Sequence, residues 1–171
     1  MVSRTRFDDS ECPVARSVDA IGDWWSLLIV RDAFDGSRRF GEFQRGLGVA
    51  KNILTARLRT LVDGGVLASV PASDGSAYRE YVLTPKGEAL FPVVVALRQW
   101  GEQNFFAPGE PHSELLDRRS QRPLRALEVL AEDGRRLSPD DTTVHKVPAR
   151  QDVPQDVPQD VPRGEGNADR N

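Results

Sequence analysis

The apolar positions between residues 40 and 62 follow the period of two helices. A long stripe falls at i, i+4, i+7 and i+8, the spacing of an amphipathic helix with one buried face. It consists of Leu54, Leu58, Leu61 and Val62. A shorter stripe precedes it, at Phe40, Phe43 and Leu47. Gly46 and Gly48 bracket the end of the shorter stripe and allow a tight turn. The pattern predicts two packed helices joined by a turn, which is the arrangement of a helix-turn-helix.

Two further helices are predicted before this unit, over residues 13–21 and 24–34. Pro13 suits the first position of a helix, with Cys12 before it as the N-cap, and Gly22 ends that helix. Asp23 can cap the second helix, and Gly36 follows its end. The buried stripe of the first helix is expected at Val14, Val18 and Ile21.

After Gly65 the pattern changes from the helical period to that of strands. Residues 66–70 and 78–83 are predicted as two strands, and an Asp-Gly pair in the loop between them is a turn signal. Such a hairpin beside a recognition helix is a wing. Thr84 and Pro85 then mark the start of a last helix over residues 85–104.

This last helix is apolar around more of its circumference than one small domain can cover. The pattern favours a partner helix from a second subunit. Pro92 should kink the helix or leave a gap in its hydrogen-bond ladder. The fold class is therefore mainly α, a winged helix-turn-helix with a small β wing and flanking dimerisation helices.

Basic side chains gather in the helix-turn-helix. Between Gly36 and Thr60 there are six basic residues and a single acid. The chain of 171 residues has a formal net charge of −3, but residues 1–107 are neutral, so the negative charge lies in the C-terminal part. Salt screens exposed charges over roughly 8–10 Å, and the local excess therefore matters more to DNA than the total. The prediction is a DNA-binding transcription factor.

The outward face of the second helix is the candidate base-reading surface. With the leucines inward, we expect Asn52, Thr55 and Arg59 to touch bases, since Asn pairs with adenine and Arg with guanine. Phosphate contacts are expected from Lys51, Arg38, Arg39 and Arg57. In the wing, Arg79 and Lys86 either reach the adjacent groove or backbone, or face solvent. The alternative for the whole set is an ordinary solvated surface.

The composition changes after Ala107. Residues 108–148 mix short apolar runs with charges and are predicted as a small extension, either a β-hairpin or a helix over 123–132, with β preferred. Residues 151–162 are three copies of Gln-Asp-Val-Pro, and proline at every fourth residue predicts a disordered tail over 149–171. The predicted organisation is a flexible segment over 1–11, the winged helix-turn-helix and dimerisation domain over 12–107, the extension and the tail.

The order and spacing of these motifs resemble the HxlR-type family of winged-helix regulators, which are relatives of the MarR group. The stretches that carry the resemblance include Cys12-Pro13-Val14, Ile21-Gly22, Arg39-Phe40, Leu54-Thr55, Leu83-Thr84 and Trp100-Gly101. The resemblance covers just over half of the chain. It implies a cytoplasmic homodimer, joined through its terminal helices, that binds palindromic operators and usually represses. The interface is then expected at Val14, Val18, Val94, Leu97 and Trp100.

The chain departs from the family pattern at the start of the recognition helix. Val49 and Ala50 replace the commoner Ile-Ser pair, which removes a side-chain cap. Longer relatives often carry a cysteine-rich extension, but residues 113–147 contain no cysteine, so a zinc site of that type is not expected.

Cys12 is the candidate for redox sensing. A thiol at a helix N-cap is expected to face the positive end of the helix dipole, which lowers its pKa, although Asp8, Asp9 and Glu11 nearby would oppose that shift. The resemblance adds that some members sense oxidants through the matching cysteine. The alternative is an inert cysteine that packs the first helix. Trp24, Trp25 and Phe34 suggest an aromatic effector pocket at the dimer junction, with plain core as the alternative.

Other classes of protein find less support in the sequence. A single cysteine excludes an intramolecular disulfide, and neither a secretory signal nor an apolar run of roughly 20 residues occurs, so a cytoplasmic protein is expected without a membrane partner. There is no Gly-rich phosphate loop or hydrolase motif, and we expect no enzymatic activity, cofactor or metal. The remaining alternative is a winged helix that binds protein instead of DNA, with its basic surface masked by the acidic tail.

Overall fold

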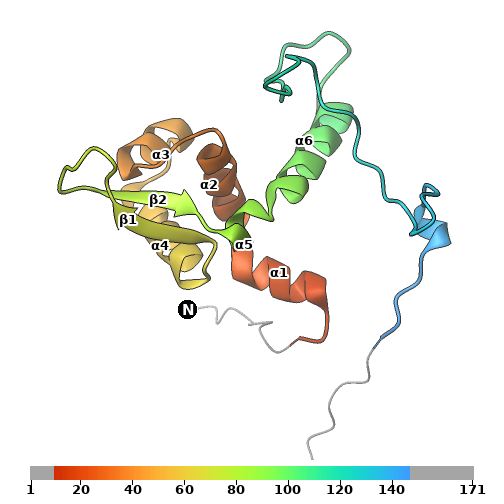
Figure 1. Ribbon diagram of the computed structural model, residues 1–171, viewed down its shortest axis with the longest axis horizontal. Helices are drawn as coiled ribbons and strands as arrows, with labels where there is room; N and C mark the ends of the chain where they lie inside the picture. The colour runs from red at the N-terminus through yellow and green to blue at the C-terminus, as the bar shows by residue number, and fades with distance from the viewer. Residues whose placement is uncertain (1–9, 147–171) are drawn as a thin grey trace, which may run out of the picture.

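The computed structural model describes residues 10–146 of the chain. The predicted Gln-Asp-Val-Pro tail and residues 1–9 of the predicted N-terminal segment lie outside the described residues. The elements are α1 (Pro13–Ile21), α2 (Trp24–Phe34), α3 (Phe40–Leu47), α4 (Lys51–Asp63), β1 (Leu67–Pro71), β2 (Arg79–Leu83), α5 (Pro85–Glu88), α6 (Phe91–Phe105) and the short 3-10 helix η1 (Pro139–Asp141). They form a mainly helical fold with a two-stranded wing, which confirms the predicted class (Figure 1).

The ends of the first two helices follow from their terminal residues. Pro13 opens α1 with Cys12 as the N-cap, and Gly22 ends it with a φ of 94°, a value that favours glycine. Asp23 caps α2, because its Oδ1 accepts the backbone N–H of Ser26 at 3.1 Å. Both boundaries agree with the sequence prediction.

The helix-turn-helix of α3 and α4 packs its apolar stripe against α2 and the wing. Leu54, Leu58 and Leu61 of α4 are buried, as their spacing predicts. They belong to one cluster with side chains of α2, α3 and the start of the wing, namely Ile29, Val30, Phe43, Val66 and Leu67. Close packing of this inward face fixes the direction of the outward face of α4.

The wing is an antiparallel pair in which Leu67 of β1 lies opposite Leu83 of β2. Both strands begin one residue later than predicted. The backbone N–H of Tyr81 also donates to the carbonyl of Arg38 at 2.7 Å, so the segment before α3 lies along β2. The wing is therefore attached to α3 as well as to the end of α4.

The junction between the wing and α5 is a close contact. The Thr84 hydroxyl accepts the backbone N–H of Gly87 at 3.1 Å and so caps α5. Gly87 is buried, and a Cβ added there would lie 2.2 Å from the carbonyl oxygen of Val66. Only glycine fits this position without a shift of the backbone.

Two predictions about the terminal helices were wrong. The single helix expected over residues 85–104 is two helices, α5 and α6, because Pro92 lies in the first turn of α6, where its missing N–H is tolerated. The stripe of α1 is not buried. Val14 is 70% exposed and Val18 is 58% exposed, since no other part of residues 10–146 covers that side of the helix.

Beyond α6 the chain continues as an extended segment, which we call the C-terminal arm (residues 107–146). It contains two isolated antiparallel bridges, Leu116 with Pro123 and Leu130 with Arg136, and η1. The helix considered for residues 123–132 is not formed, and the preferred β-hairpin is reduced to chain reversals without strands. Figure 1 shows the arm running from the end of α6 away from the winged helix. None of the helices in the described part is long and apolar enough to cross a membrane.

Candidate nucleic-acid interface

The outward face of α4 presents polar side chains from Lys51 to Arg59. Lys51, Asn52, Thr55 and Arg59 are all exposed. The side chain of Arg59 is 82% exposed, and its Nε lies 3.6 Å from a carboxylate oxygen of Asp63 in the next turn. The Thr55 hydroxyl donates to the carbonyl of Lys51 at 2.8 Å, which leaves its oxygen able to accept a hydrogen bond. This face offers the donors and acceptors that base edges in a major groove require.

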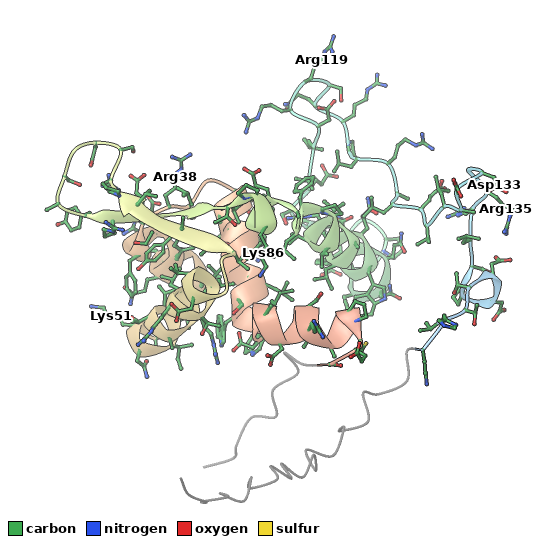
Figure 2. All side chains as sticks on the ribbon, turned by 60° about the horizontal axis from the view of Figure 1, so that its bottom comes forward. Arg38, Lys51, Lys86, Arg119, Asp133 and Arg135 are labelled. Carbon is green, nitrogen blue, oxygen red and sulfur yellow. The ribbon has the colours of Figure 1, made fainter. Side chains whose placement is uncertain are left out.

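The first turn of α4 has no side-chain cap. Ala50 is the N-cap, and no side chain accepts the backbone N–H groups that follow it, as the sequence predicts. These N–H groups and the adjacent ammonium of Lys51 make the tip of the helix positive. Figure 2 shows Lys51 projecting outward at this tip. An anionic phosphate is the ligand that such a helix end suits.

A groove of about 640 Å³ runs between α3 and the wing. Its lining is charged and aromatic, and it includes Arg39, Phe40, Glu42, Arg45, Tyr78, Arg79 and Tyr81. Arg45 and Tyr78 were not among the residues predicted to contact DNA. In the sequence, Arg45 is only one of six basic residues between Gly36 and Thr60. No local pattern distinguishes Tyr78, whose side chain is exposed because it lies just after the turn of the wing.

Arg39 lies in this groove but is bound to the wing. Its Nη2 is 2.6 Å from Oδ2 of Asp74 and 3.4 Å from Oε1 of Glu80. Hydrogen bonds from Arg39, and then from Ser76, hold the pKa of Asp74 well below its usual value. The acidic tip of the wing is thereby neutralised. The sequence predicts that Arg39 contacts a phosphate. In the structure, its ion pairs attach the start of α3 to the wing.

Two other arginines of the predicted set are exposed: Arg38, predicted to hold a phosphate, and Arg79, predicted either to reach the adjacent groove or backbone or to face solvent. The side chain of Arg38 is exposed and points away from the ribbon (Figure 2), while its backbone N–H donates to Glu42 at 2.7 Å. Arg79 is also exposed. Its guanidinium donates to the hydroxyl of Ser69 at 3.1 Å and also to the carbonyl of Ser69, which fixes its position on the wing.

Arg57 and Lys86, both predicted as DNA contacts, have structural partners instead. Nη2 of Arg57 is 2.5 Å from Oδ2 of Asp23, so Arg57 ties α4 to the N-cap of α2. Nζ of Lys86 donates to the carbonyl of Gly64 at 2.8 Å, at the C-terminal end of α4. There its charge complements the negative end of the helix dipole, at the opposite end from Lys51.

The predicted regulatory residues lie on α1 and α2. Cys12 is exposed, and its thiol accepts no backbone N–H of α1. The rings of Trp24 and Trp25 pack with centroids 4.4 Å apart, whereas Phe34 packs edge-on against Phe91 of α6 at 5.2 Å. Because Phe34 is also roughly 13 Å along α2 from Trp25, the structure does not bring the three predicted aromatic rings together.

A cavity of about 290 Å³ instead lies between α2 and α6. Its apolar walls include Leu28 and Val94, and Arg31 and Arg98 lie among the lining residues. The arm contributes to one side through His112. No local sequence pattern marks this cavity, because its walls come from two helices and the arm. Within residues 10–146 no three His, Cys, Asp or Glu side chains are grouped so that they could hold a metal ion.

The residues predicted for a dimer interface lie on α1 and α6. Val14, Val18, Leu97 and Trp100 are exposed in the single chain, and Val94 is half-buried. They are available for a partner subunit.

The buried leucine stripe, the exposed polar face on the same helix and the attached wing define a winged helix-turn-helix protein. The comparison with protein families narrows this class. The chain belongs to the HxlR family, since the HxlR-like helix-turn-helix matches residues 20–108.

Relatives of this chain share more than the helix-turn-helix. Rv3095 of Mycobacterium tuberculosis strain H37Rv, named as an uncharacterised HTH-type transcriptional regulator, is 42% identical over 102 residues, which are 60% of this chain and 65% of that one. The chain thus spans just under two thirds of the length of the mycobacterial relative. The solved candidate transcription factor PA1607 is 57% identical with a TM-score of 0.79, and the match covers 84% of this chain and 100% of PA1607. The match to PA1607 covers more residues than the chain has up to residue 108, where the family match ends. It therefore includes part of the arm.

A third similar structure is that of the redox regulator HypR in its oxidised form. It is 33% identical with a TM-score of 0.51, and the match covers 56% of this chain and 100% of HypR.

Proposed function

We propose that this protein is a sequence-specific DNA-binding transcriptional regulator that represses as a homodimer on a palindromic operator. The observation that carries the proposal is the outward face of α4, where Asn52, Thr55 and Arg59 are exposed while the leucine stripe of the same helix is buried. A helix packed on one face presents the other to a major groove in a fixed orientation. The family and the names of the relatives support the same activity.

The side chains divide into three roles. Asn52, Thr55 and Arg59 read bases, because all three are exposed on the outward face of α4. Phosphates are held by exposed cations around this face, which are Lys51, Arg38, Arg45 and Arg79. Arg39 and Arg57 act indirectly, since each is bound to a carboxylate of another element and orients α3 or α4.

The homodimer follows from the apolar side chains that the single chain leaves uncovered. Val14 and Val18 of α1 and Leu97 and Trp100 of α6 are large and exposed. A two-fold pair of chains would cover both helices with the same surface on each subunit. The same symmetry would place two α4 helices on two half-sites of a palindrome.

Binding to a labelled duplex from the upstream region of its own gene, measured by fluorescence anisotropy, tests this proposal. We expect tight binding to this duplex, weak binding to a scrambled one, and a logarithmic affinity that falls linearly with the logarithm of salt, with a slope near −0.9 for each phosphate contact. Equal and weak binding to both duplexes contradicts it and favours the protein-binding alternative.

Single substitutions then separate the roles of the cations. Arg59→Ala should relax the preference for one base position, by about 1–3 kcal/mol. Lys51→Ala should weaken binding to all duplexes alike and reduce the salt slope by about 1. Arg119→Ala is a matched control, because Arg119 is an exposed arginine on the arm, away from α4 (Figure 2). If Arg59→Ala leaves the profile across base positions unchanged, Arg59 does not read a base.

Release from the operator is proposed to follow oxidation of Cys12 or the binding of a small ligand. Cys12 is exposed at the start of α1, a helix of the proposed dimer interface, and HypR, similar over half of this chain, is a redox regulator. The cavity between α2 and α6 is the candidate for a ligand. In the anisotropy assay, peroxide should release the wild-type protein and leave Cys12→Ser bound. Equal release of both proteins excludes Cys12 as the sensor.

A further inference from the structure

The second half of the arm has a defined local structure. Residues 128–137, which we call the arm hairpin, reverse the chain with two backbone hydrogen bonds of 2.8 Å, from Ala131 to Arg135 and from Leu137 to Val129. Gly134 has a φ of 83°, which such a tight reversal requires. The segment is thus folded back on itself and is not a plain extended linker.

The arm hairpin does not contact the body of its own chain through polar groups. The last attachment to α6 is the amide of Gln99, which donates to the carbonyl of Arg125 at 2.9 Å and accepts the N–H of Leu127 at 2.8 Å. Among the described residues, the hydrogen bonds and ion pairs of residues 128–146 all stay within that segment, such as Arg136 with Glu128 at 3.6 Å. Figures 1 and 2 both show this part of the arm standing apart from the helices.

A hairpin of this size needs a surface to pack against. An isolated two-stranded hairpin is marginally stable at best in water. Here Val129 is 67% exposed and Leu130 is 52% exposed. The turn that follows them carries Glu132 and Asp133, both exposed, whereas Arg135 and Arg136 on the returning segment already pair with Asp141 and Glu128. A complementary surface therefore has an apolar floor and a basic rim.

The chain carries a surface of this kind at the junction of α1 and α5. A groove of about 270 Å³ there has apolar side chains that include Ile21, Val66 and Leu90. Two basic residues, Arg16 and Lys86, also line it. Lys86 lies at the C-terminal end of α4, so this groove is separate from the DNA-reading face. We call it the α1–α5 groove.

We infer that the arm hairpin of one chain docks in the α1–α5 groove of a second copy, so that two chains exchange arms. Val129 meets the apolar floor, and Glu132 and Asp133 meet Arg16 and the ammonium of Lys86. Leu130 faces the other side of the hairpin, because consecutive side chains of an extended segment alternate. Each chain carries both the hairpin and the groove, so one two-fold axis satisfies both pairs at once and closes the assembly at two copies. The inference rests on the proposed homodimer and adds to it a second contact, which adjoins the exposed face of α1 at Ile21.

Paramagnetic relaxation between subunits tests the exchange directly. A nitroxide is attached to Asp140→Cys in a Cys12→Ser chain, because Asp140 is exposed just after the hairpin and is not one of the proposed contacts. This protein, which carries no ¹⁵N, is mixed with ¹⁵N-labelled Cys12→Ser protein until the subunits have exchanged. Only contacts between two copies can then broaden amide signals. We expect broadening at Ile21 and Leu90, beside the groove, and unchanged signals at Lys51 at the far tip of α4.

The control is the same sample with the nitroxide reduced, which must restore every signal. Sedimentation of the same proteins and operator binding by Cys12→Ser are measured alongside. A dimer without broadening at the groove overturns the arm exchange and leaves the proposed homodimer standing. A monomer overturns both. Loss of operator binding with intact broadening overturns the proposed function alone.

Charge reversal gives an independent readout. Asp133→Arg should raise the dissociation constant of the dimer about threefold to tenfold, because two like charges then face each other at the rim of the groove. Arg16→Glu in the same chain should restore the affinity. Asp140→Arg, an exposed acid after the hairpin, is the matched control and should change nothing. If Arg16→Glu does not restore the dimer, the hairpin does not dock in the α1–α5 groove.

Discussion

Asp23→Ala should destabilise the fold more than any other substitution of an exposed or half-exposed acid in the helix-turn-helix region. The two carboxylate oxygens of Asp23 have different partners. Oδ1 accepts the N–H of Ser26 at 3.1 Å and caps α2, whereas Oδ2 lies 2.5 Å from Nη2 of Arg57 on α4. One side chain thus starts one helix and holds the recognition helix against it.

The magnitude follows from these two contacts. Loss of an N-cap costs about 1 kcal/mol. The side chains of Asp23 and Arg57 are 20% and 29% exposed, so their ion pair adds about 0.5–1 kcal/mol. A half-buried guanidinium left without its partner adds about 1 kcal/mol. The free energy of unfolding should therefore fall by about 2–3 kcal/mol, and Tm by about 8–12 °C for a domain of this size.

Urea unfolding followed by circular dichroism, at one fixed protein concentration because the protein is proposed to dimerise, measures this loss. Asp23→Asn is the matched variant. It keeps an acceptor for the Ser26 N–H and removes the charge, so it should lose only about half as much. The reasoning is refuted if Asp23→Ala loses less than about 0.5 kcal/mol, or if Asp23→Asn loses as much as Asp23→Ala.

Three further substitutions test the packing and the wing. Leu58→Ala should lower the free energy of unfolding by about 2–5 kcal/mol, because Leu58 is fully enclosed in the core, and a loss below 1 kcal/mol in urea unfolding would contradict that placement. Gly87→Ala should lower it by about 1–3 kcal/mol, since the new Cβ meets a carbonyl oxygen, whereas Gly41→Ala, whose Cβ meets only the end of a flexible side chain at 3.3 Å, should change it by less than about 0.5 kcal/mol. Arg39→Gln should return the pKa of Asp74 toward its ordinary value near 3.9. Because that pKa is lowered in the folded protein, the contribution of Asp74 to stability is complete above about pH 4 and is lost as the pH falls through the folded pKa. An NMR titration of the Asp74 carboxyl in both proteins checks this, and equal pKa values would exclude the role of Arg39.

The helix-turn-helix could be predicted because local spacing defines it. Leu54, Leu58 and Leu61 repeat with the helical period, and that repeat alone identifies the buried face of α4. The ends of α1 and α2 could also be predicted, because capping residues and prolines act on the backbone within one helical turn. The exposed face of α4 then followed from geometry.

The partners of the charged side chains could not be predicted from the same information. Arg39 and Asp74 are 35 residues apart, and only the folded wing brings them together. Lys86 looked like a wing cation, yet its partner is the carbonyl of Gly64, which becomes available because α4 ends there. The arm was equally hidden. It has no sequence period, and in the described part of the chain its hydrogen bonds with α6 come from two side chains of that helix. Arg98 donates to Ser113, and Gln99 bonds backbone groups of residues 125 and 127.

The internal ion pairs change how the basic cluster acts. When a free surface cation binds a phosphate, counterions are released from the DNA. Its contribution to the affinity therefore falls as the salt concentration rises. A cation already paired with a carboxylate of another element adds little to that attraction, and it fixes geometry instead. Arg39 joins α3 to the wing, and Arg57 joins α4 to α2. The count of basic residues in the sequence therefore overstates the number of phosphate contacts. It also understates how firmly α4 is oriented, and specificity depends on that orientation, because a base-reading side chain must meet one edge of one base pair.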